Sequence, residues 1–237
     1  MSHHSDLIDT TEMYLRTVYE LEEEGTVPLR ARIAERLGQS GPTVSQTVAR
    51  MERDGLVHVA QDRHLELTDQ GRREATWVMR KHRLAERLLL DVIGLDWEDV
   101  HIEACRWEHV MSEAVERRIV GMLSGPLVCP HGNPIPGLHE LGVVQGAAER
   151  EADTLVTITQ AAHRDDSTGS SATVLIERIS EQLQPDAALM HRLSESGLRP
   201  GNQVKVSTSG DGVEVWSDGG PVPLERTVAD HIFVRPS

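Results

Sequence analysis

The sequence predicts a mainly α-helical protein with a β-rich tail. Three observations indicate this class. Apolar residues recur at helical spacing through most of residues 6–123, and residues 56–68 interrupt that pattern with the alternation typical of short strands. After residue 172, short alternating pieces between glycine-rich turns predict a small barrel. The order of these patterns predicts a winged helix-turn-helix domain, then a helical domain, then a small β-barrel domain.

The first helix is expected over residues 6–23. Asp9, followed three positions later by Glu12, makes a start like a capping box, and an apolar stripe follows on one face. Met13 lies about 160° from the centre of that stripe, so it faces away from the core. A surface methionine is one interpretation, and a thioether ligand that reaches another domain is the other.

Residues 29–37 and 42–53 are expected to form a helix-turn-helix. Pro42 opens the second helix at its first position, and Gly55 ends it. This second helix is rich in Ser, Thr and Gln, as in helices that read DNA. Residues 56–68 then predict two strands around a polar turn, which makes the unit a winged helix-turn-helix.

Two longer helices are expected at residues 71–92 and 97–123. Both carry more apolar surface than one small bundle buries, which favours a dimer interface. Residues 125–142 are a loop rich in proline and glycine, and residues 160–171 are expected to be flexible. Short strands are predicted in the tail at residues 172–179, 203–207, 213–216 and 231–234.

The net charge of −14 is unevenly distributed. Residues 28–87 carry twelve Arg or Lys against eight Asp or Glu, whereas the remainder carries twelve against thirty. A basic segment within an acidic chain permits nucleic-acid binding there and disfavours it elsewhere. Uneven surface charge without a function is the alternative that these counts leave open.

Composition points to a globular protein in the cytoplasm. Hydrophobic residues make up 38% and charged residues 26%, and no apolar run approaches the ~20 residues of a membrane span. No basic segment precedes an apolar one, so no export signal and no membrane partner are expected. The two cysteines, Cys105 and Cys129, are expected to be free thiols rather than a disulfide.

Potential metal ligands lie at helical spacing on the two longer helices. Those on the second helix fall within an arc of about 100°, away from its apolar stripe. Imidazole, thiolate and carboxylate together suit a first-row transition ion and suit calcium or magnesium poorly. Together with the predicted winged helix-turn-helix upstream, these ligands indicate a metal-sensing transcription factor. The ligands are His82 and Glu86 on the first helix, and His101, Cys105, Glu108 and His109 on the second.

Four strings of residues resemble the iron-dependent repressors of the diphtheria toxin repressor family. They are DTTEMYLRT from residue 9, LRARIAERL from residue 29, SGPTVSQTVARMERDGL from residue 40 and EACRWEHVM from residue 103. The resemblance is close through about residue 142 and looser in the tail, where the family carries an SH3-like domain.

The resemblance implies four segments. They are a winged helix-turn-helix DNA-binding domain at residues 1–73, a helical dimerisation and metal-binding domain at 74–142, a linker and flexible segment with the first barrel strand at 143–171, and an SH3-like domain at 172–237.

Two metal sites per chain are implied by the same resemblance. The primary site falls on Met13, Cys105, Glu108 and His109. The ancillary site falls on His82, Glu86 and His101, with the third-domain pair Glu181 and Gln184, one helical turn apart.

An anion pocket beside the ancillary site would use Arg83 and Asn133. Cys129 stands where iron-dependent members have serine in that pocket, so the resemblance leaves its role open. The remaining loop histidines lack a spacing that indicates ligands and are expected to be solvated; they are His131, His139 and His163.

Soft sulfur at Met13 and Cys105 favours Fe²⁺ as the effector, because manganese-sensing relatives place carboxylates at these positions. Co²⁺, Ni²⁺, Mn²⁺ or Zn²⁺ are expected to bind as well. A sensor that binds its ion reversibly uses mixed ligands, whereas four thiolates suit structural zinc.

The implied function is an Fe²⁺-activated repressor that binds palindromic operators of iron-homeostasis genes as homodimers, with two dimers per operator as in the family. Metal binding would clamp the N-terminal helix to the dimerisation domain. A manganese-responsive regulator of the same architecture is the alternative. A metalloenzyme is a remote one, since the chain has no His-Glu-x-x-His motif and no evident general base.

On DNA, the second helix of the helix-turn-helix would enter the major groove. Gln46 would pair with a base edge, and Ser40 and Pro42 would contact thymine methyls. Phosphate contacts would fix the register without reading sequence. The remaining residues expected at the DNA are Arg30, Thr43, Ser45, Arg50 and Arg63.

Overall fold

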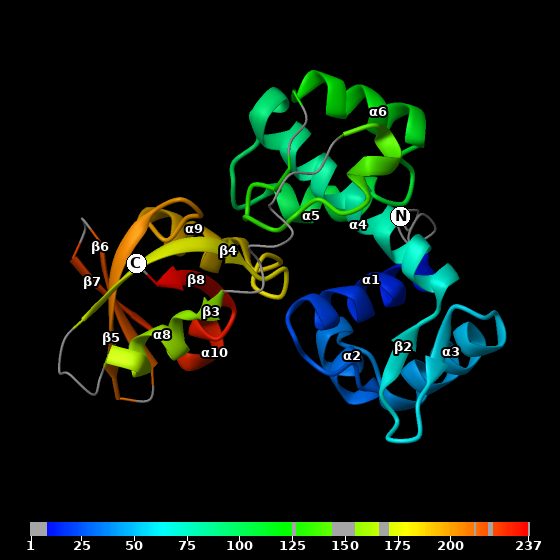
Figure 1. Ribbon diagram of the computed structural model, residues 1–237, viewed down its shortest axis with the longest axis horizontal. Coiled ribbons are helices and arrows are strands. Elements are labelled where there is room, and N and C mark those ends of the chain that lie inside the picture. The colour runs from blue at the N-terminus through cyan, green and yellow to red at the C-terminus, as the bar shows by residue number, and fades with distance from the viewer. Residues whose placement is uncertain are drawn as a thin grey trace, which may run out of the picture.

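The computed structural model describes residues 9–124, 127–143, 155–165, 171–210, 212–217 and 220–236. Figure 1 shows three lobes: a blue-to-cyan lobe, a green lobe above it and a yellow-to-red lobe beside both. Each lobe has its own apolar core. The long helix α4 (Asp69–Leu88) runs from the first lobe into the second.

The first lobe is the predicted winged helix-turn-helix. The Asp9 carboxylate accepts hydrogen bonds from the N–H groups of Thr11 and Glu12, so α1 begins after Asp9. Residues 6–8 of the predicted helix lie outside the described residues. The Ser40 hydroxyl caps the third helix in the same way. The elements are α1 (Thr10–Glu23), α2 (Arg30–Leu37), α3 (Gly41–Arg53), β1 (Val57–Val59) and β2 (Leu65–Leu67).

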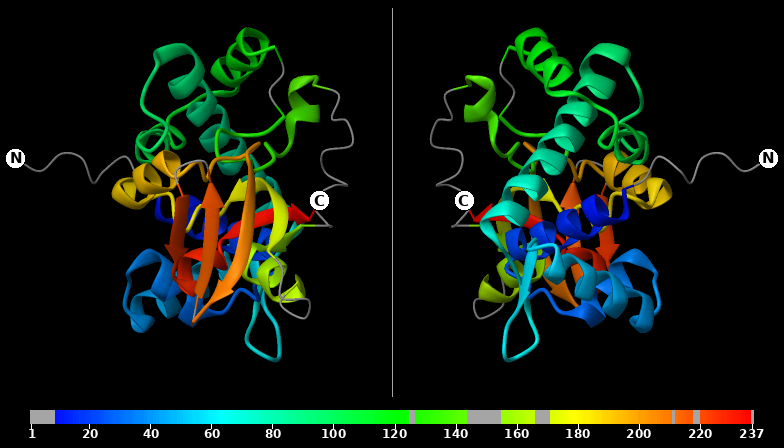
Figure 2. Two further views of the ribbon diagram at one scale, coloured as in Figure 1. Left: turned by 90° about the vertical axis from the view of Figure 1, so that its left-hand side faces the viewer. Right: turned by 90° about the vertical axis from the view of Figure 1, so that its right-hand side faces the viewer.

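The wing is the antiparallel pair β1 and β2. Val57 lies opposite Leu67, and Val59 lies opposite Leu65. Figure 2 shows the turn between the two strands projecting from the molecule at the end away from α6. The wing turn therefore projects from the first lobe, and β1 packs next to α3.

The second lobe breaks the helix predicted over residues 97–123. Val110 and Met111 both donate their N–H to Trp107 O at 3.1 Å, and Ser112 is extended, so the helix ends and restarts. The prediction of one continuous helix was wrong. Glu108 still has helical dihedral angles and donates its N–H to Ala104 O at 3.0 Å, and His109 lies in the turn at 108–110 where the helix ends. The elements are α4, the π-helical turn η1 (Leu89–Ile93), α5 (Val100–Trp107), α6 (Glu113–Met122) and the 3₁₀ turn η2 (Leu138–Leu141).

The third lobe is an antiparallel sheet with strand order β3-β8-β4-β5-β6-β7 and helices packed on it. Four of its strands occupy the predicted segments. The strands are β3 (Val156–Thr157), β4 (Ala172–Ile179), β5 (Gln203–Ser209), β6 (Gly212–Ser217), β7 (Gly220–Leu224) and β8 (Ile232–Pro236); the helices are α8 (Ile158–Asp165), α9 (Ala187–Glu195) and α10 (Arg226–Ala229).

Sequence patterns missed parts of this lobe. β7 contains Pro221 and Pro223, which disfavour a strand, but it pairs only with β6 and lies at the sheet edge, where proline is tolerated. The expected flexibility of residues 160–171 was wrong for the part that α8 covers, because Ala161 and Ala162 pack into the core of the sheet. Residues 166–170 lie outside the described part of the chain.

Several contacts between the lobes are polar, and Trp97 and Leu90 of the helical lobe also pack against the apolar core of the sheet. Arg36 Nη2 donates to Gln182 Oε1 at 2.7 Å, and Arg178 Nη2 donates to Glu23 O at 3.1 Å. No helix of the described segments is long and apolar enough to cross a membrane.

Gly71, in the first turn of α4, is a close contact between α4 and the wing. A Cβ there would lie 1.9 Å from Leu56 O. Gly71→Ala should therefore lower the free energy of unfolding by about 1–3 kcal/mol, the usual effect of overpacking. Gly121→Ala is the matched control, because a Cβ in α6 meets no atom within 4 Å and should be neutral or stabilising. Urea unfolding checks both, and equal stability changes would contradict the prediction.

Candidate metal centre

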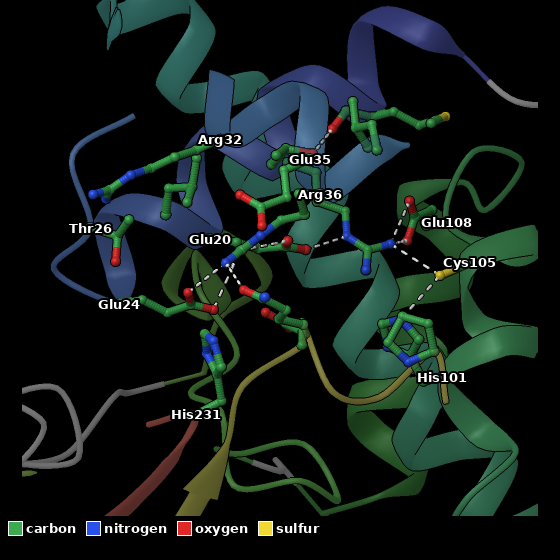
Figure 3. Close-up of a pocket in the computed structure, with 18 of the residues that line it drawn as sticks. Glu20, Glu24, Thr26, Arg32, Glu35, Arg36, His101, Cys105, Glu108 and His231 are labelled. Atoms are coloured by element: carbon green, nitrogen blue, oxygen red, sulfur yellow. Dashed lines mark hydrogen bonds and ion pairs between the residues drawn. The ribbon is translucent and has the colours of Figure 1, made fainter. Parts of the chain in front are cut away.

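The predicted ligands converge from separate elements around a cleft of about 900 Å³. Met13 of α1 lines this cleft with Cys105 of α5 and with Glu108 and His109 of the following turn. Figure 3 shows Cys105, Glu108 and His101 close together on one side, with Glu20, Glu24 and Arg36 on the other. The structure thus brings all four residues of the predicted primary set to one space between two domains.

The break after α5 directs His109 toward α1. His109 Nδ1 lies 2.5 Å from Glu12 Oε2, and its Nε2 lies 3.4 Å from Glu108 Oε1. His101, Cys105 and Glu108 thus keep the predicted helical spacing. His109 reaches the site through the turn.

Sequence analysis missed Arg16, which holds the donor atoms together in this structure. Its Nη1 lies 2.7 Å from Glu108 Oε2, 3.2 Å from Cys105 Sγ and 3.4 Å from His82 Nδ1. Arg16 follows Met13 by three positions, so helical spacing alone places it on the ligand face. Because these donors gather around a cation, their chemistry fits a divalent metal ion.

Arg16 lowers the pKa of two acidic groups beside it, Cys105 and Glu108. Burial would raise the pKa of the Cys105 thiol, but the Arg16 guanidinium and the His101 imidazole hold it well below its usual range. Burial would likewise raise the pKa of Glu108, which Arg16 and then His82 lower to about 2. Thiolate and carboxylate are the forms that bind metal.

The ancillary helix ligands adjoin the primary set. Glu86 Oε1 lies 3.1 Å from His82 Nε2 and 3.3 Å from His101 Nδ1, and all three side chains are buried. His82 Nδ1 lies 2.7 Å from Glu108 Oε2. His82 therefore connects the two predicted sets into one continuous cluster. Burial would lower the pKa of His101, but Cys105 and Glu86 raise it to about 9.

Glu181 and Gln184, the two residues of the third lobe in the predicted ancillary site, form hydrogen bonds with other protein groups in this structure. Glu181 accepts hydrogen bonds from Arg83 Nε at 2.9 Å and Nη2 at 3.1 Å, and Gln184 Nε2 donates to Ile179 O at 2.9 Å. Residues 181–185 form turns rather than an α-helix. Gln184 Oε1 is buried and has no hydrogen-bond partner in the described segments.

The predicted anion-binding residues also contact the protein itself. Arg83 is fully buried and binds the carboxylates of Glu23 and Glu181 and the carbonyl oxygen of Pro134. Asn133 Nδ2 donates to Ile179 O at 2.9 Å. Glu23 and Glu181 thus occupy the guanidinium that was expected to bind a free anion.

The expectation that His131 is solvated was wrong. Its side chain has no exposed surface, because the loop folds back on itself and Ile179 donates its N–H to His131 O at 2.8 Å. His139 and His163 are exposed, as expected. Cys105 and Cys129 are free thiols, as expected. One donor atom each of Glu86, Cys129 and His131 lies within 4.8 Å of the other two; the Cys-x-His spacing was the sequence signal for this group.

The predicted DNA contacts belong to α2, to α3 with its cap, and to the wing turn of the first lobe. Arg63 lies in the wing turn, with a positive φ of 72°, and is exposed; Arg30 is half-buried at the start of α2. The remaining predicted contacts belong to α3 or its cap and are exposed: Ser40, Pro42, Thr43, Ser45, Gln46 and Arg50.

Comparison with known protein families matches each lobe. A model described as the N-terminal DNA-binding domain of iron-dependent repressors matches residues 6–65. A model described as their metal-binding and dimerisation domain matches residues 68–137, and a FeoA domain model matches residues 167–236. Fold and matches together define a winged-helix regulator with a metal-binding and dimerisation domain.

Relatives that match over almost the whole chain belong to the same family as these domain models. The chain is 60% identical over 216 residues to the iron-dependent repressor IdeR of Mycobacterium tuberculosis, covering 91% of both chains. It is 55% identical over 230 residues to the diphtheria toxin repressor of Corynebacterium diphtheriae, covering 97% of this chain and 98% of the relative. The chain belongs to the iron-dependent repressor family. This family consists of repressors, so the prediction that the chain is not an enzyme is confirmed.

Solved structures show the same fold. The crystal structure of T. acidophilum IdeR matches with a TM-score of 0.75 at 30% identity, covering 97% of this chain and 99% of that one. A manganese-dependent transcriptional repressor in complex with manganese matches with a TM-score of 0.77 at 27% identity, covering 96% and 100%.

Arg16→Gln should raise the pKa of the Cys105 thiol in the metal-free chain, because it removes a cation that stabilises the thiolate. Alkylation of Cys105 at neutral pH should slow, and its pH profile should move to higher pH. Iodoacetamide labelling in a Cys129→Ser background measures this. Arg36→Gln is the control, since Arg36 pairs with Glu24 across the cleft. An unchanged profile in Arg16→Gln would show that Arg16 does not set the charge of Cys105.

Proposed function

We propose that this chain is an Fe²⁺-activated transcriptional repressor of iron-homeostasis genes that acts as a homodimer in the cytoplasm. One observation carries the proposal. Met13 belongs to the DNA-binding domain, and it lines the same cleft as Cys105, Glu108 and His109 of the dimerisation domain. A ligand set that spans two domains makes their arrangement depend on the ion.

The primary metal would be held by Met13, Cys105, Glu108 and His109. The second ion would be held by His82, Glu86 and His101, and the recruitment of Glu181 and Gln184 requires Glu181 to release Arg83. An anion would reach Arg83 and Asn133 only after the same release. When bound, the ion supplies a direct attraction between the first and second lobes.

The residues of the chain account for the rest of the response. In the metal-free chain, the Arg16 guanidinium balances the negative charges of Glu108 and Cys105 and lies within hydrogen-bond distance of both. Through the metal ion, Met13 links the position of α1 to the dimerisation domain. The orientation of α3 therefore depends on whether the ion is bound. Coupling of about 1–3 kcal/mol between metal and operator binding corresponds to about 5–150-fold tighter DNA binding.

Iron is favoured over manganese by the sulfur ligands. Met13 and Cys105 both offer soft donors, and manganese prefers oxygen. Co²⁺, Ni²⁺, Mn²⁺ and Zn²⁺ would bind the same residues. The second candidate is a manganese-responsive repressor, and the structural match to a manganese-dependent repressor in complex with manganese supports keeping it.

The dimer and its operator follow from the exposed faces. The helical lobe exposes Trp77, Val110, Val115 and Met122, as a dimer interface requires. Two α3 helices related by a twofold axis would read a palindrome, with two dimers per operator as the larger assembly. Gln46 would contact a base edge, and Ser40, Pro42 and Ser45 would lie in the groove beside it. Phosphates would be bound by Arg30, Thr43, Arg50 and Arg63.

Met13→Leu and Met13→Ala test the spanning ligand set. Both remove the sulfur, and leucine keeps the volume and apolar character of the side chain. Each should reduce Fe²⁺-dependent operator affinity by about 5–150-fold while leaving the fold intact. Anaerobic fluorescence anisotropy with Fe²⁺ and with chelator measures the loss, and circular dichroism checks the fold. Normal activation of Met13→Leu would remove Met13 from the sensing set.

Gln46→Ala should relax base preference with little change in the salt dependence of DNA binding. Arg50→Ala is the matched control on the same helix. It should weaken binding to all sequences and reduce the salt slope by about one. Selection from a randomised duplex pool, with and without Fe²⁺, measures the base preference. Salt titration of DNA affinity measures the salt slope. A uniform loss in Gln46→Ala would make Gln46 a phosphate or structural contact instead.

A further inference from the structure

A second group of donor atoms lies on the loop that follows α6. The loop turns back on itself, since Cys129 N–H donates to Asn133 O at 2.8 Å and Gly132 N–H donates to Cys129 O at 3.0 Å. This turn brings the Cys129 and His131 side chains to Glu86 on α4. Neither Cys129 nor His131 belongs to the primary or the ancillary set.

The loop is anchored on two further sides. Ile179 of β4 donates its N–H to His131 O at 2.8 Å. Gly132 has a φ of +86°, and a Cβ there would lie 1.9 Å from a backbone oxygen of β4, so only glycine fits. Trp97 donates from its indole nitrogen to Pro130 O at 3.1 Å, and its ring lies 4.8 Å from that of His131. The donor atoms are therefore held against α4 by the fold.

Several polar atoms of this group lack partners, although Glu86 Oε1 contacts His82 and His101, and Cys129 Sγ accepts from Asn133 Nδ2 at 3.8 Å. Glu86 and His131 have no exposed surface, and Cys129 is 2% exposed. Glu86 Oε2 and both ring nitrogens of His131 have no hydrogen-bond partner within the described segments. Buried polar atoms are normally satisfied, and leaving them unpaired costs free energy. A bound cation would pair the unsatisfied atoms of Glu86 and His131, and Cys129 Sγ lies beside them as a further ligand.

We propose that Glu86, Cys129 and His131 form a thiolate-containing site for a divalent transition ion, with zinc the best fit. One sulfur, one imidazole nitrogen and one carboxylate oxygen match the ligands that zinc takes in proteins. They do not match calcium or magnesium, which take oxygen. Three protein ligands leave a fourth position for water. The site shares only Glu86 with the ancillary set, and it does not depend on DNA binding.

A buried ion pair between His131 and Glu86 is the competing explanation. Its shortest distance is 3.4 Å, from His131 Nδ1 to Glu86 Oε1, without hydrogen-bond geometry. It leaves Glu86 Oε2 unpaired and gives Cys129 no role. The metal site explains all three side chains, and it would join α4 to the loop that contacts β4.

Cobalt binding to the full-length chain tests the proposal. Cys105→Ser removes the thiol of the primary set, so Cys129 is the one remaining cysteine. Anaerobic Co²⁺ should still give the near-ultraviolet absorption of a thiolate-to-cobalt bond in this variant. The added change Cys129→Ser should abolish it. The added change His131→Phe should weaken Co²⁺ binding by about ten-fold or more, whereas His139→Phe, an exposed histidine on the same chain segment, should not.

X-ray absorption of the zinc-loaded Met13→Leu/Cys105→Ser chain, which lacks both sulfur ligands of the primary set, gives a second readout that does not need the Cys129 variant to fold. A sulfur neighbour at about 2.3 Å is expected for a zinc–thiolate bond. Absence of the cobalt band in Cys105→Ser together with a zinc shell of nitrogen and oxygen alone would overturn the proposal. A band that persists in Cys105→Ser/Cys129→Ser would overturn it too. Because both readouts measure metal binding alone, failure here is separate from failure of the proposed repressor function.

Discussion

The arrangement of the three lobes depends on one buried guanidinium. Arg83 of α4 binds Glu23 at the end of α1 and Glu181 after β4, so a side chain of the helical lobe holds both neighbouring lobes. Breaking a buried ion pair by removing one partner typically costs about 3–5 kcal/mol, because the other charge remains unpaired. The lobes therefore cannot separate one at a time without leaving a charge exposed or unpaired.

The same constraint explains why the ligands lie where they do. Each lobe has an apolar core, and Trp97 of the helical lobe packs into the core of the sheet, whereas the surfaces that line the cleft carry charges. Arg16, Glu108 and His82 form a network in which each charge is balanced by a neighbour on another element. The energy of such an interface depends on electrostatics, so a divalent ion changes it far more than it would change an apolar contact.

Sequence periodicity predicted the fold class, the helix-turn-helix, the wing and four strands, because each depends on local pattern, caps and turn residues. It failed where tertiary contacts override the pattern. The helix predicted over residues 97–123 breaks after Trp107, α8 forms because its alanines pack on the sheet, and β7 tolerates proline as an edge strand. His131 was assigned to solvent because a proline-rich loop gives no sign of the strand that covers it.

The sequence by itself determined which residue types are available and on which helix faces they lie, since 3.6 residues per turn place His82 with Glu86 and His101 with Cys105. Only the tertiary structure decided how those faces meet. It turned Glu108 and His109 toward α1, placed Arg16 among the donor atoms, and brought Cys129 and His131 to Glu86. Periodicity is a property of one segment, whereas a site between lobes depends on the packing of several segments that are far apart in the chain.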